Sequence, residues 1–283
     1  MKIGFVGAGK TGCTLGKYFT DHEIDVAGYF SKSRNSARMA AEFTGTRCFE
    51  SLEDAVESSD IIFITASDGA IGEIWDSIKK LAIGDKIVCH CSGSLSSDVF
   101  TGIEESGAYG YSVHPMYAIS DRYNSHVNFT EATVTIEGSE KHRDFVSDLF
   151  RKSGNTIKII SRENKPLYHA ASVVVSNHVV GLIQFGVDLL EDCGFTGEEA
   201  LEALFPLINN NVDNIRKSGI VNSLTGPVER GDAETVQKHL ESLDGEDREL
   251  YRLLTRRILK IAKVKNKDRD YGEFDMLMEE QIL

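Results

Sequence analysis

Two observations predict an α/β domain followed by an all-α domain. Up to about residue 160, short β-rich runs alternate with helical stretches, the pattern of a parallel sheet with crossover helices. From Asn164 onward the strand signal stops and only helical periodicity continues. A chain of 283 residues also exceeds the usual size of a single domain. We therefore expect two domains, residues 1–160 and residues 161–283.

Eight segments have the β-branched and aromatic residues that predict strands. They are Lys2 to Val6, Asp25 to Phe30, Thr46 to Phe49, Ile61 to Thr65, Lys86 to Cys91, Gly110 to His114, Ala132 to Glu137 and Thr156 to Ile160. Apolar residues at three- and four-residue spacing predict crossover helices at Thr11 to Thr20, Ser33 to Phe43, Leu52 to Glu57, Gly69 to Leu81 and Ser139 to Lys152. The second domain is expected to contain the helices Lys165 to Asp192, Gly197 to Ser218, Asp232 to Leu243 and Glu246 to Lys263.

Composition limits the classes of partner. A formal net charge of −13 disfavours binding to nucleic acids and anionic membranes, so we expect small-molecule partners. The five cysteines have the spacing of neither a zinc site nor a disulfide framework. The amino terminus enters directly into a strand pattern, and we find no run approaching ~18 uncharged apolar residues. These features favour a cytoplasmic protein with reduced thiols.

A glycine-rich turn joins the first predicted strand to the first predicted helix. It reads Gly7-Ala8-Gly9-Lys10-Thr11-Gly12, which matches the pattern G-x-G-x-x-G. Gly7 permits the tight turn, Gly9 lets the backbone approach a pyrophosphate, and Gly12 lets the helix pack closely on the strand. Because the motif occupies the first βα turn of an alternating chain, it predicts a nicotinamide dinucleotide site on a Rossmann domain.

The loop after the second strand distinguishes the two nicotinamide cofactors. An acid at this strand end would hydrogen-bond the ribose 2′-hydroxyl and repel a 2′-phosphate. The sequence instead continues as Ser31-Lys32-Ser33-Arg34, two hydroxyls and two cations suited to a phosphomonoester. This loop favours NADP(H), although a solvated basic loop at a helix start would look the same.

Two later strand ends are expected to line the same crevice, because ligands of open α/β sheets bind outside the carboxyl ends of the strands. One end carries Ala66 and Ser67, and the other carries Ser92 and Gly93. These small residues let a ribose and a nicotinamide lie against the backbone, while each stretch taken alone also fits a simple turn.

The helix that begins near Lys165 carries a second candidate site. Asn164 is expected to cap it, and Pro166 is tolerated in its first turn. At ~100° per residue, Lys165, His169, Ser172 and Ser176 form one polar stripe on an otherwise apolar helix, with Asn177 at its edge. A helix this apolar should be largely buried. Its polar stripe should therefore face a ligand, water or a packing partner.

His114 is a further candidate. It lies in His114-Pro115-Met116, at the carboxyl end of a predicted strand, where its imidazole could approach the crevice or bond into the following turn.

Several motifs together resemble one family. They are Gly7-Ala8-Gly9, His90-Cys91-Ser92-Gly93, His114-Pro115-Met116, Tyr168-His169-Ala170-Ala171 with Ser176-Asn177, and Leu224-Thr225-Gly226-Pro227 to Arg230-Gly231-Asp232. The chain resembles, over nearly its whole length, oxidoreductases that join a Rossmann-like domain to a helical DUF2520 domain. That family is similar in layout to ketopantoate reductases, pyrroline-5-carboxylate reductases and 3-hydroxyacid dehydrogenases.

The resemblance implies NADPH-dependent reduction of 2-dehydropantoate to pantoate, a step of pantothenate biosynthesis, in a homodimer paired through the helical domain. The related reductases carry a lysine followed one turn later by an asparagine, whereas here Lys165 is followed at that position by His169. The lysine's role as proton donor transfers to Lys165. His169 and Asn177 are then the candidates for positioning a ketone that bears a carboxylate, and His169 and His114 are the next candidates for the proton donor.

Two alternatives remain open. One is an imine reductase of the pyrroline-5-carboxylate type, and the other is a redox sensor that binds NADP(H) without turnover. Turnover of NADPH with a panel of keto acids and cyclic imines separates the three hypotheses.

Overall fold

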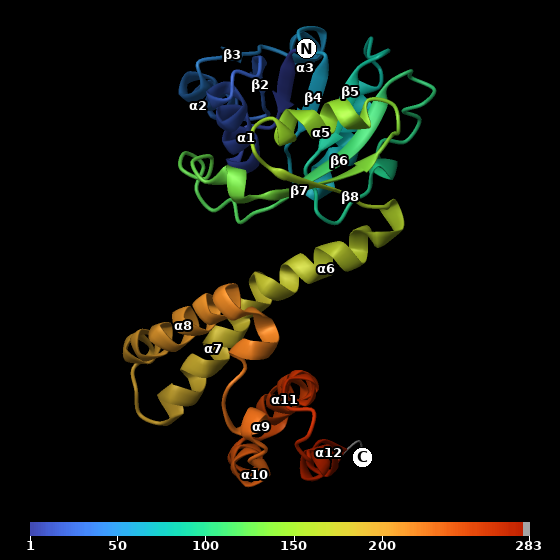
Figure 1. The fold of residues 1–283 in the computed structure, drawn as a ribbon. Helices are drawn as coiled ribbons and strands as arrows, with labels where there is room; N and C mark the ends of the chain where they lie inside the picture. The colour runs from blue at the N-terminus through green and yellow to red at the C-terminus, as the bar shows by residue number, and fades with distance from the viewer. Residues whose placement is uncertain (280–283) are drawn as a thin grey trace. The chain divides into compact units, whose positions relative to one another are not determined.

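The computed structural model describes residues 1–279, and their contacts group them into two compact units divided at Asn177 and His178. The first unit is built on one eight-stranded sheet of order β3-β2-β1-β4-β5-β6-β7-β8 (Figure 1). The strands are β1 Ile3–Val6, β2 Val26–Phe30, β3 Arg47–Cys48, β4 Ile61–Ile64, β5 Ile87–His90, β6 Tyr109–Met116, β7 Thr133–Gly138 and β8 Thr156–Ile159. All eight strands predicted from the sequence are confirmed.

The sheet places its switch point beside the glycine-rich turn. The chain leaves β1 toward β2 and β3 on one side, then crosses over to β4 on the other side of β1. Loops that follow β1 and β4 therefore diverge and leave a crevice at the carboxyl ends of these strands.

One feature of the predicted sheet is wrong. β6 and β7 pair antiparallel, whereas the other neighbours pair parallel. Between them, residues 117–132 form loops with only the short 3-10 helix η2 Phe129–Glu131, so no crossover helix returns the chain to the starting edge of β6. Because β7 begins at the end of the sheet where β6 finishes, it must run antiparallel to β6.

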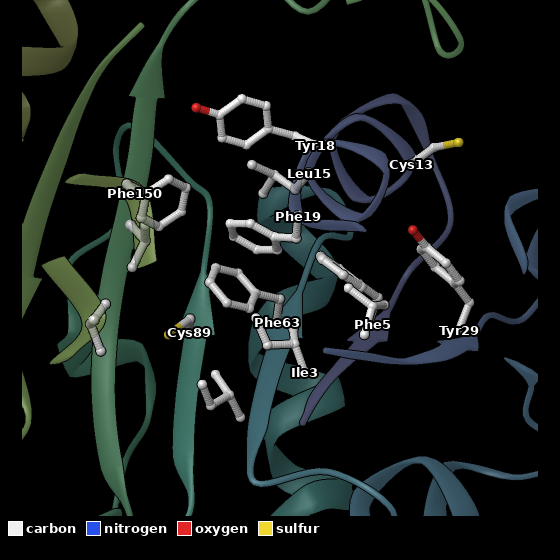
Figure 2. Close-up of a cluster of buried hydrophobic side chains, with 14 of the residues drawn as sticks. Ile3, Phe5, Cys13, Leu15, Tyr18, Phe19, Tyr29, Phe63, Cys89 and Phe150 are labelled. Atoms are coloured by element: carbon white, nitrogen blue, oxygen red, sulfur yellow. The ribbon is translucent and has the colours of Figure 1, made fainter. Parts of the chain in front are cut away.

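Helices cover both faces of the sheet. The predicted crossover helices are confirmed as α1 Lys10–Asp21, α2 Arg34–Thr44, α3 Leu52–Glu57, α4 Asp68–Ile78 and α5 Arg143–Arg151. Alternate residues of β4 point to opposite faces, so that Phe63 packs in one apolar cluster and Ile62 in another. Figure 2 shows Phe5, Phe19 and Phe63 gathered in the first cluster. Burial on both faces explains why these strands read as continuous apolar runs.

A buried hydrogen-bond network joins α1 to the segment that follows α5. The Tyr18 hydroxyl lies 2.8 Å from both the Ser153 carbonyl oxygen and Asn155 Oδ1, and the Asn155 amide donates to the Phe129 and Ala132 carbonyl oxygens. Tyr18 is 1% exposed, so these groups have no water to replace their partners.

The second unit is helical, as the sequence predicts. After α6 Lys165–Val175, whose residues group with the first unit, it contains α7 Asn177–Asp192, α8 Gly197–Ser223, α9 Pro227–Arg230, α10 Ala233–Ser242, α11 Gly245–Lys265 and α12 Gly272–Glu279. The helices α9 and α12 were not predicted. Val236, Leu259 and Phe274 belong to a buried apolar cluster of α9 to α12. The boundary predicted near residue 160 stays a prediction.

The prediction that the helix from Lys165 is largely buried is wrong for this single chain. Lys165 is the buried residue of α6 and Val187 that of α7, while Val175 and Val180 are about 70% exposed. By length and composition alone, residues Arg162–Asp192 could also cross a membrane, so the expectation that no run approaches ~18 uncharged apolar residues overlooks this segment. Sequence periodicity identifies an apolar helix but not what covers it.

We expect Tyr18→Phe to lower the free energy of unfolding of the first unit by about 1–3 kcal/mol, because the Asn155 and Ser153 oxygens lose a buried donor. Chemical denaturation followed by circular dichroism measures the change. Tyr123→Phe is the matched control, since Tyr123 is 36% exposed and should change little. Equal stability of the two variants would contradict the assignment.

Candidate functional site

The glycine-rich turn has the geometry that a dinucleotide needs. Gly7 has φ +115°, and a Cβ there would lie 2.8 Å from the Thr65 carbonyl, so a side chain is excluded. A Cβ on Gly12 would lie 2.6 Å from the Gly7 carbonyl oxygen, which explains the close packing of α1 on the turn. A Cβ on Gly9 would meet nothing within 4 Å. The open side of the turn is thus at Gly9, at the N-terminus of α1, where a pyrophosphate would bind.

A cavity of about 690 Å³ adjoins this turn at the switch point of the sheet. Among its lining residues are Gly7, Ala8, Gly9, Ser31, Lys32, Ala66 and Ser67. The structure therefore brings together the predicted pyrophosphate turn, part of the predicted 2′-phosphate loop and one of the two later strand ends. Lys10 and Thr11 begin α1 beside the turn. The residues fit a dinucleotide.

Arg34 lies outside this cavity lining. Its guanidinium Nη2 is 2.5 Å from Glu50 Oε1, and both side chains are largely exposed. Ser33 caps α2 by accepting a hydrogen bond from the Ser36 backbone N–H. Lys32 is thus the cation of this loop that already faces the cavity, whereas Arg34 must exchange a carboxylate partner for a phosphate.

Ser92 and Gly93 belong to a second centre, at the carboxyl ends of β5 and β6. The Ser92 and Ser94 hydroxyls each donate to Asp68 Oδ2 at 2.8 Å, which links the loop after β5 to the first residue of α4. The Ser92 N–H donates to His90 Nδ1, and His90 Nε2 then carries the proton donated to the Ser96 carbonyl oxygen. Burial lowers the pKa of His90 to about 4, so its imidazole stays neutral at pH 7.

Lys165 anchors α6 in this centre. Its Nζ donates to the Ser92 carbonyl oxygen at 2.9 Å and to the Ser112 hydroxyl at 2.7 Å, and the residue is 1% exposed. Burial lowers the pKa of Lys165 to about 8, against the opposing effect of acidic groups led by Glu137. The ammonium has three N–H donors, so one remains for a ligand after these two bonds. The helix cap predicted at Asn164 is wrong, since its side chain makes no capping bond.

Two histidines complete the centre. His114 Nδ1 lies 2.7 Å from the Tyr168 hydroxyl. A Cβ on Gly93 would lie 2.9 Å from His114 Nε2 and would clash with His169 Nδ1, so only glycine lets both imidazoles pack here. Burial, followed by the charges of Lys165 and His169, lowers the pKa of His114 to about 4.

The structure separates Asn177 from this group. Asn177 begins α7, is exposed and accepts a hydrogen bond from Ser176. Asn177 lies beyond the end of α6, whose 11 residues from Lys165 span about 16 Å at the usual helical rise. Lys165, His169 and His114 are therefore brought together, and Asn177 is not.

Sequence reasoning assigned no individual role to Asp68, Ser112 and Tyr168. Asp68 directly follows the predicted strand end Ala66-Ser67, and its carboxylate is the acceptor that two nearby serines lack. Tyr168 lies three residues after Lys165, on the same helix face. These positional signals were present, whereas nothing in the pattern of β6 marks Ser112.

Two family models cover most of the chain. A Rossmann-like domain matches residues 1–115, and a domain of unknown function, DUF2520, matches residues 132–258. The chain joins a Rossmann-like domain to a DUF2520 domain. The resemblance drawn from the sequence is confirmed, and the DUF2520 match begins inside the sheet, just before β7.

Solved structures share this architecture. Protein TM1727 of Thermotoga maritima is 27% identical, with 93% of this chain and 99% of that chain covered at a TM-score of 0.74. A proposed NADP oxidoreductase of Bacteroides fragilis is 21% identical, with 92% and 98% covered and a TM-score of 0.72. Pyrroline carboxylate reductase of Plasmodium falciparum, solved with NADP bound, is 18% identical, with 94% and 97% covered and a TM-score of 0.59. A search of curated proteins finds no match to this chain.

We expect Arg34→Ala to weaken NADPH binding by about 1.5–3 kcal/mol while leaving NADH binding almost unchanged, because only NADPH carries the 2′-phosphate. Glu50→Gln should tighten NADPH by less than about 1 kcal/mol, since it removes a competing, largely exposed ion pair. Fluorescence titration with both cofactors measures these changes. Arg38→Ala, one turn along α2, is the control. Equal losses for NADPH and NADH in Arg34→Ala would show that this loop does not recognise the phosphate.

Proposed function

We propose that this protein is an NADPH-dependent oxidoreductase that reduces a small ketone bearing a carboxylate, with 2-dehydropantoate, reduced to pantoate, as the best candidate. The observation that carries the proposal is the buried Lys165, whose pKa is lowered to about 8 beside His114 and His169. It belongs to the same unit as the dinucleotide cavity, at the same edge of the sheet.

NADP(H) is the cofactor. Its pyrophosphate would bind the turn from Gly7 to Gly12, and Lys32 and Arg34 would hold its 2′-phosphate. The two neighbours described above as NADP oxidoreductase and as pyrroline carboxylate reductase with NADP support this choice. The cofactor supplies the hydride, so the protein must orient the substrate and provide a proton.

Lys165 provides that proton in this proposal. An ammonium with a pKa near neutral transfers its proton to an alkoxide more readily than an ordinary lysine does. Ser92 and Ser112 hold its Nζ in place, which leaves the third N–H for the substrate oxygen. His169 and His114, both half-buried, lie beside Gly93 in the loop whose Ser92 carbonyl oxygen accepts a hydrogen bond from this nitrogen.

Reduction of a cyclic imine is the second candidate function, supported by the fold shared with pyrroline carboxylate reductase. A redox sensor would use the same cofactor cavity without needing a lysine of lowered pKa. Oxidation of NADPH with either class of substrate excludes the sensor, whereas tight NADPH binding without turnover of any panel member would contradict the reductase.

We expect Lys165→Ala to lower the rate of reduction about 100- to 10,000-fold, with NADPH affinity unchanged. Lys165→Arg should fail to restore it, because a guanidinium does not release its proton at accessible pH. Since the acid must be protonated, the wild-type rate should fall as the pH rises through about 8. Single-turnover oxidation of NADPH at saturating cofactor measures all three effects.

Lys158→Ala is the matched control, because Lys158 is an exposed lysine of β8. Near-wild-type rates in Lys165→Ala or Lys165→Arg would remove Lys165 as the acid. Circular dichroism distinguishes lost catalysis from lost folding, since Lys165→Ala also leaves the Ser92 carbonyl oxygen without its donor.

A homodimer in the cytoplasm is part of the proposal. The helices α7 and α8 (Figure 1) expose many apolar side chains, including Val180, Leu182, Phe205, Leu207 and Val212. Charged residues such as Asp213, Arg216 and Lys217 on α8 disfavour a bilayer as their partner. A second copy would bury this apolar surface at a gain of about 1.5–3 kcal/mol for each large side chain.

We expect Phe205→Asp to convert a dimer into a monomer, because a carboxylate would lose its hydration in an apolar interface. Light scattering coupled to size exclusion measures the mass. Asn210→Asp adds the same charge to the same helix at an exposed polar position about 140° around the helix from Phe205, and should leave the dimer intact. A wild-type mass of one chain would contradict the proposal.

A further inference from the structure

Tyr168 holds a position that the proposed reaction does not yet use. It lies three residues after Lys165 on α6, and its hydroxyl is 2.7 Å from His114 Nδ1. The two rings meet edge to face, with centroids 5.6 Å apart. Burial raises the pKa of Tyr168, so the phenol keeps its proton at neutral pH.

This contact selects one tautomer of His114. A neutral imidazole carries one N–H and one lone pair, and the hydrogen bond at one nitrogen decides which nitrogen has the proton. His114 is neutral at pH 7, because burial and the nearby Lys165 and His169 disfavour its cation more than Asp68 favours it. The phenol is a stronger acid than a neutral imidazole N–H, which favours donation from the Tyr168 hydroxyl to Nδ1. The remaining proton is then on Nε2.

The Nε2 atom of His114 faces the loop after β5, which the sequence predicts to line the ligand crevice. It packs against Gly93, at the carboxyl edge of β5 and β6, together with the His169 ring. His169 Nδ1 is buried there without a hydrogen-bond partner in residues 1–279. The Lys165 ammonium, bonded to the carbonyl oxygen of Ser92, lies beside the same loop.

We propose that Tyr168 is a positioning residue that fixes His114 as an Nε2–H donor, so that this centre binds a carbonyl oxygen and disfavours a protonated imine. The proposal rests on the proposed reductase function and chooses between its two substrate classes. A ketone oxygen accepts hydrogen bonds, whereas an iminium nitrogen is a cationic donor without a lone pair. An iminium would therefore face a second donor and the Lys165 charge.

The same donors match the charge that develops in ketone reduction. Hydride adds to the carbonyl carbon, the C=O π pair moves to oxygen, and the oxygen takes a proton from Lys165, which becomes a neutral amine. The hydrogen bond from His114 Nε2–H strengthens as the oxygen gains charge, and His114 keeps its proton throughout. The reduced nicotinamide would supply the electron pair of the hydride.

Histidine NMR tests the tautomer without any turnover. Full-length protein labelled with ¹⁵N-histidine should show His114 as the neutral Nε2–H form at pH 7, and still neutral at pH 5.5. Tyr168→Phe should shift the Nδ1 and Nε2 signals toward a mixture of tautomers, since Nδ1 loses its donor. Tyr117→Phe, which changes a nearby tyrosine whose hydroxyl is not bonded to His114, is the control, and His114→Gln assigns the signals. A proton on Nδ1 in the wild type, or signals unchanged in Tyr168→Phe, would overturn the proposal.

Kinetics test the substrate class. With NADPH at saturation and pH 7, kcat/KM should be higher for 2-dehydropantoate than for 1-pyrroline-5-carboxylate, and Tyr168→Phe should lower kcat for the ketone about 10- to 100-fold with NADPH affinity unchanged. A higher value for the imine would overturn the ketone preference. If neither compound is reduced, the ketone preference is overturned, the wider panel of keto acids and cyclic imines decides the reductase function, and the NMR result alone decides the role of Tyr168.

Discussion

The candidate centre depends on one pair of contacts, the hydrogen bonds that the Lys165 ammonium donates to the Ser92 carbonyl oxygen and to the Ser112 hydroxyl. These bonds fix the first turn of α6 against the ends of β5 and β6, and α6 in turn carries Tyr168 and His169 to Gly93. Without them, an α6 whose apolar residues are largely exposed would have little to hold it on the sheet. The cost of burying the charge appears as the lowered pKa of Lys165, which is also the property that the proposed chemistry needs.

The parts of the fold with strong local signals could be predicted from the sequence. The central strands β1, β4 and β5 are buried on both faces, Gly7 and Gly12 each lie too close to neighbouring backbone for a side chain, and Gly9 is left open, so pattern and motif were sufficient. The antiparallel pairing of β6 and β7 was not accessible, because strand direction depends on a loop of residues 117–132 that has no periodicity. The exposure of α6 and α7 depends on what covers them, which one chain's sequence does not encode.

The candidate centre was predictable only in part, for a related reason. Helical spacing placed Lys165 and His169 on one face, and the strand end gave His114, but the partners of these groups come from other strands. Ser112 is an ordinary residue of a buried strand until Lys165 reaches it. Arg34 shows a contact that its loop does not reveal, since its guanidinium pairs with Glu50, sixteen residues away. The sequence pattern does not show which side chains from distant segments will form hydrogen bonds or ion pairs with one another.

Electrostatics adds a constraint on any substrate of this site. With a formal net charge of −13, the chain as a whole repels both NADPH and a carboxylate. Remote surface charges are screened beyond about 8 Å at physiological salt, whereas a buried charge is screened much less. Lys32 at the cavity and Lys165 beneath the loop after β5 therefore govern the local field where an anion would bind. The same field opposes a cationic imine, so the charge of Lys165 and the tautomer of His114 favour the same class of substrate.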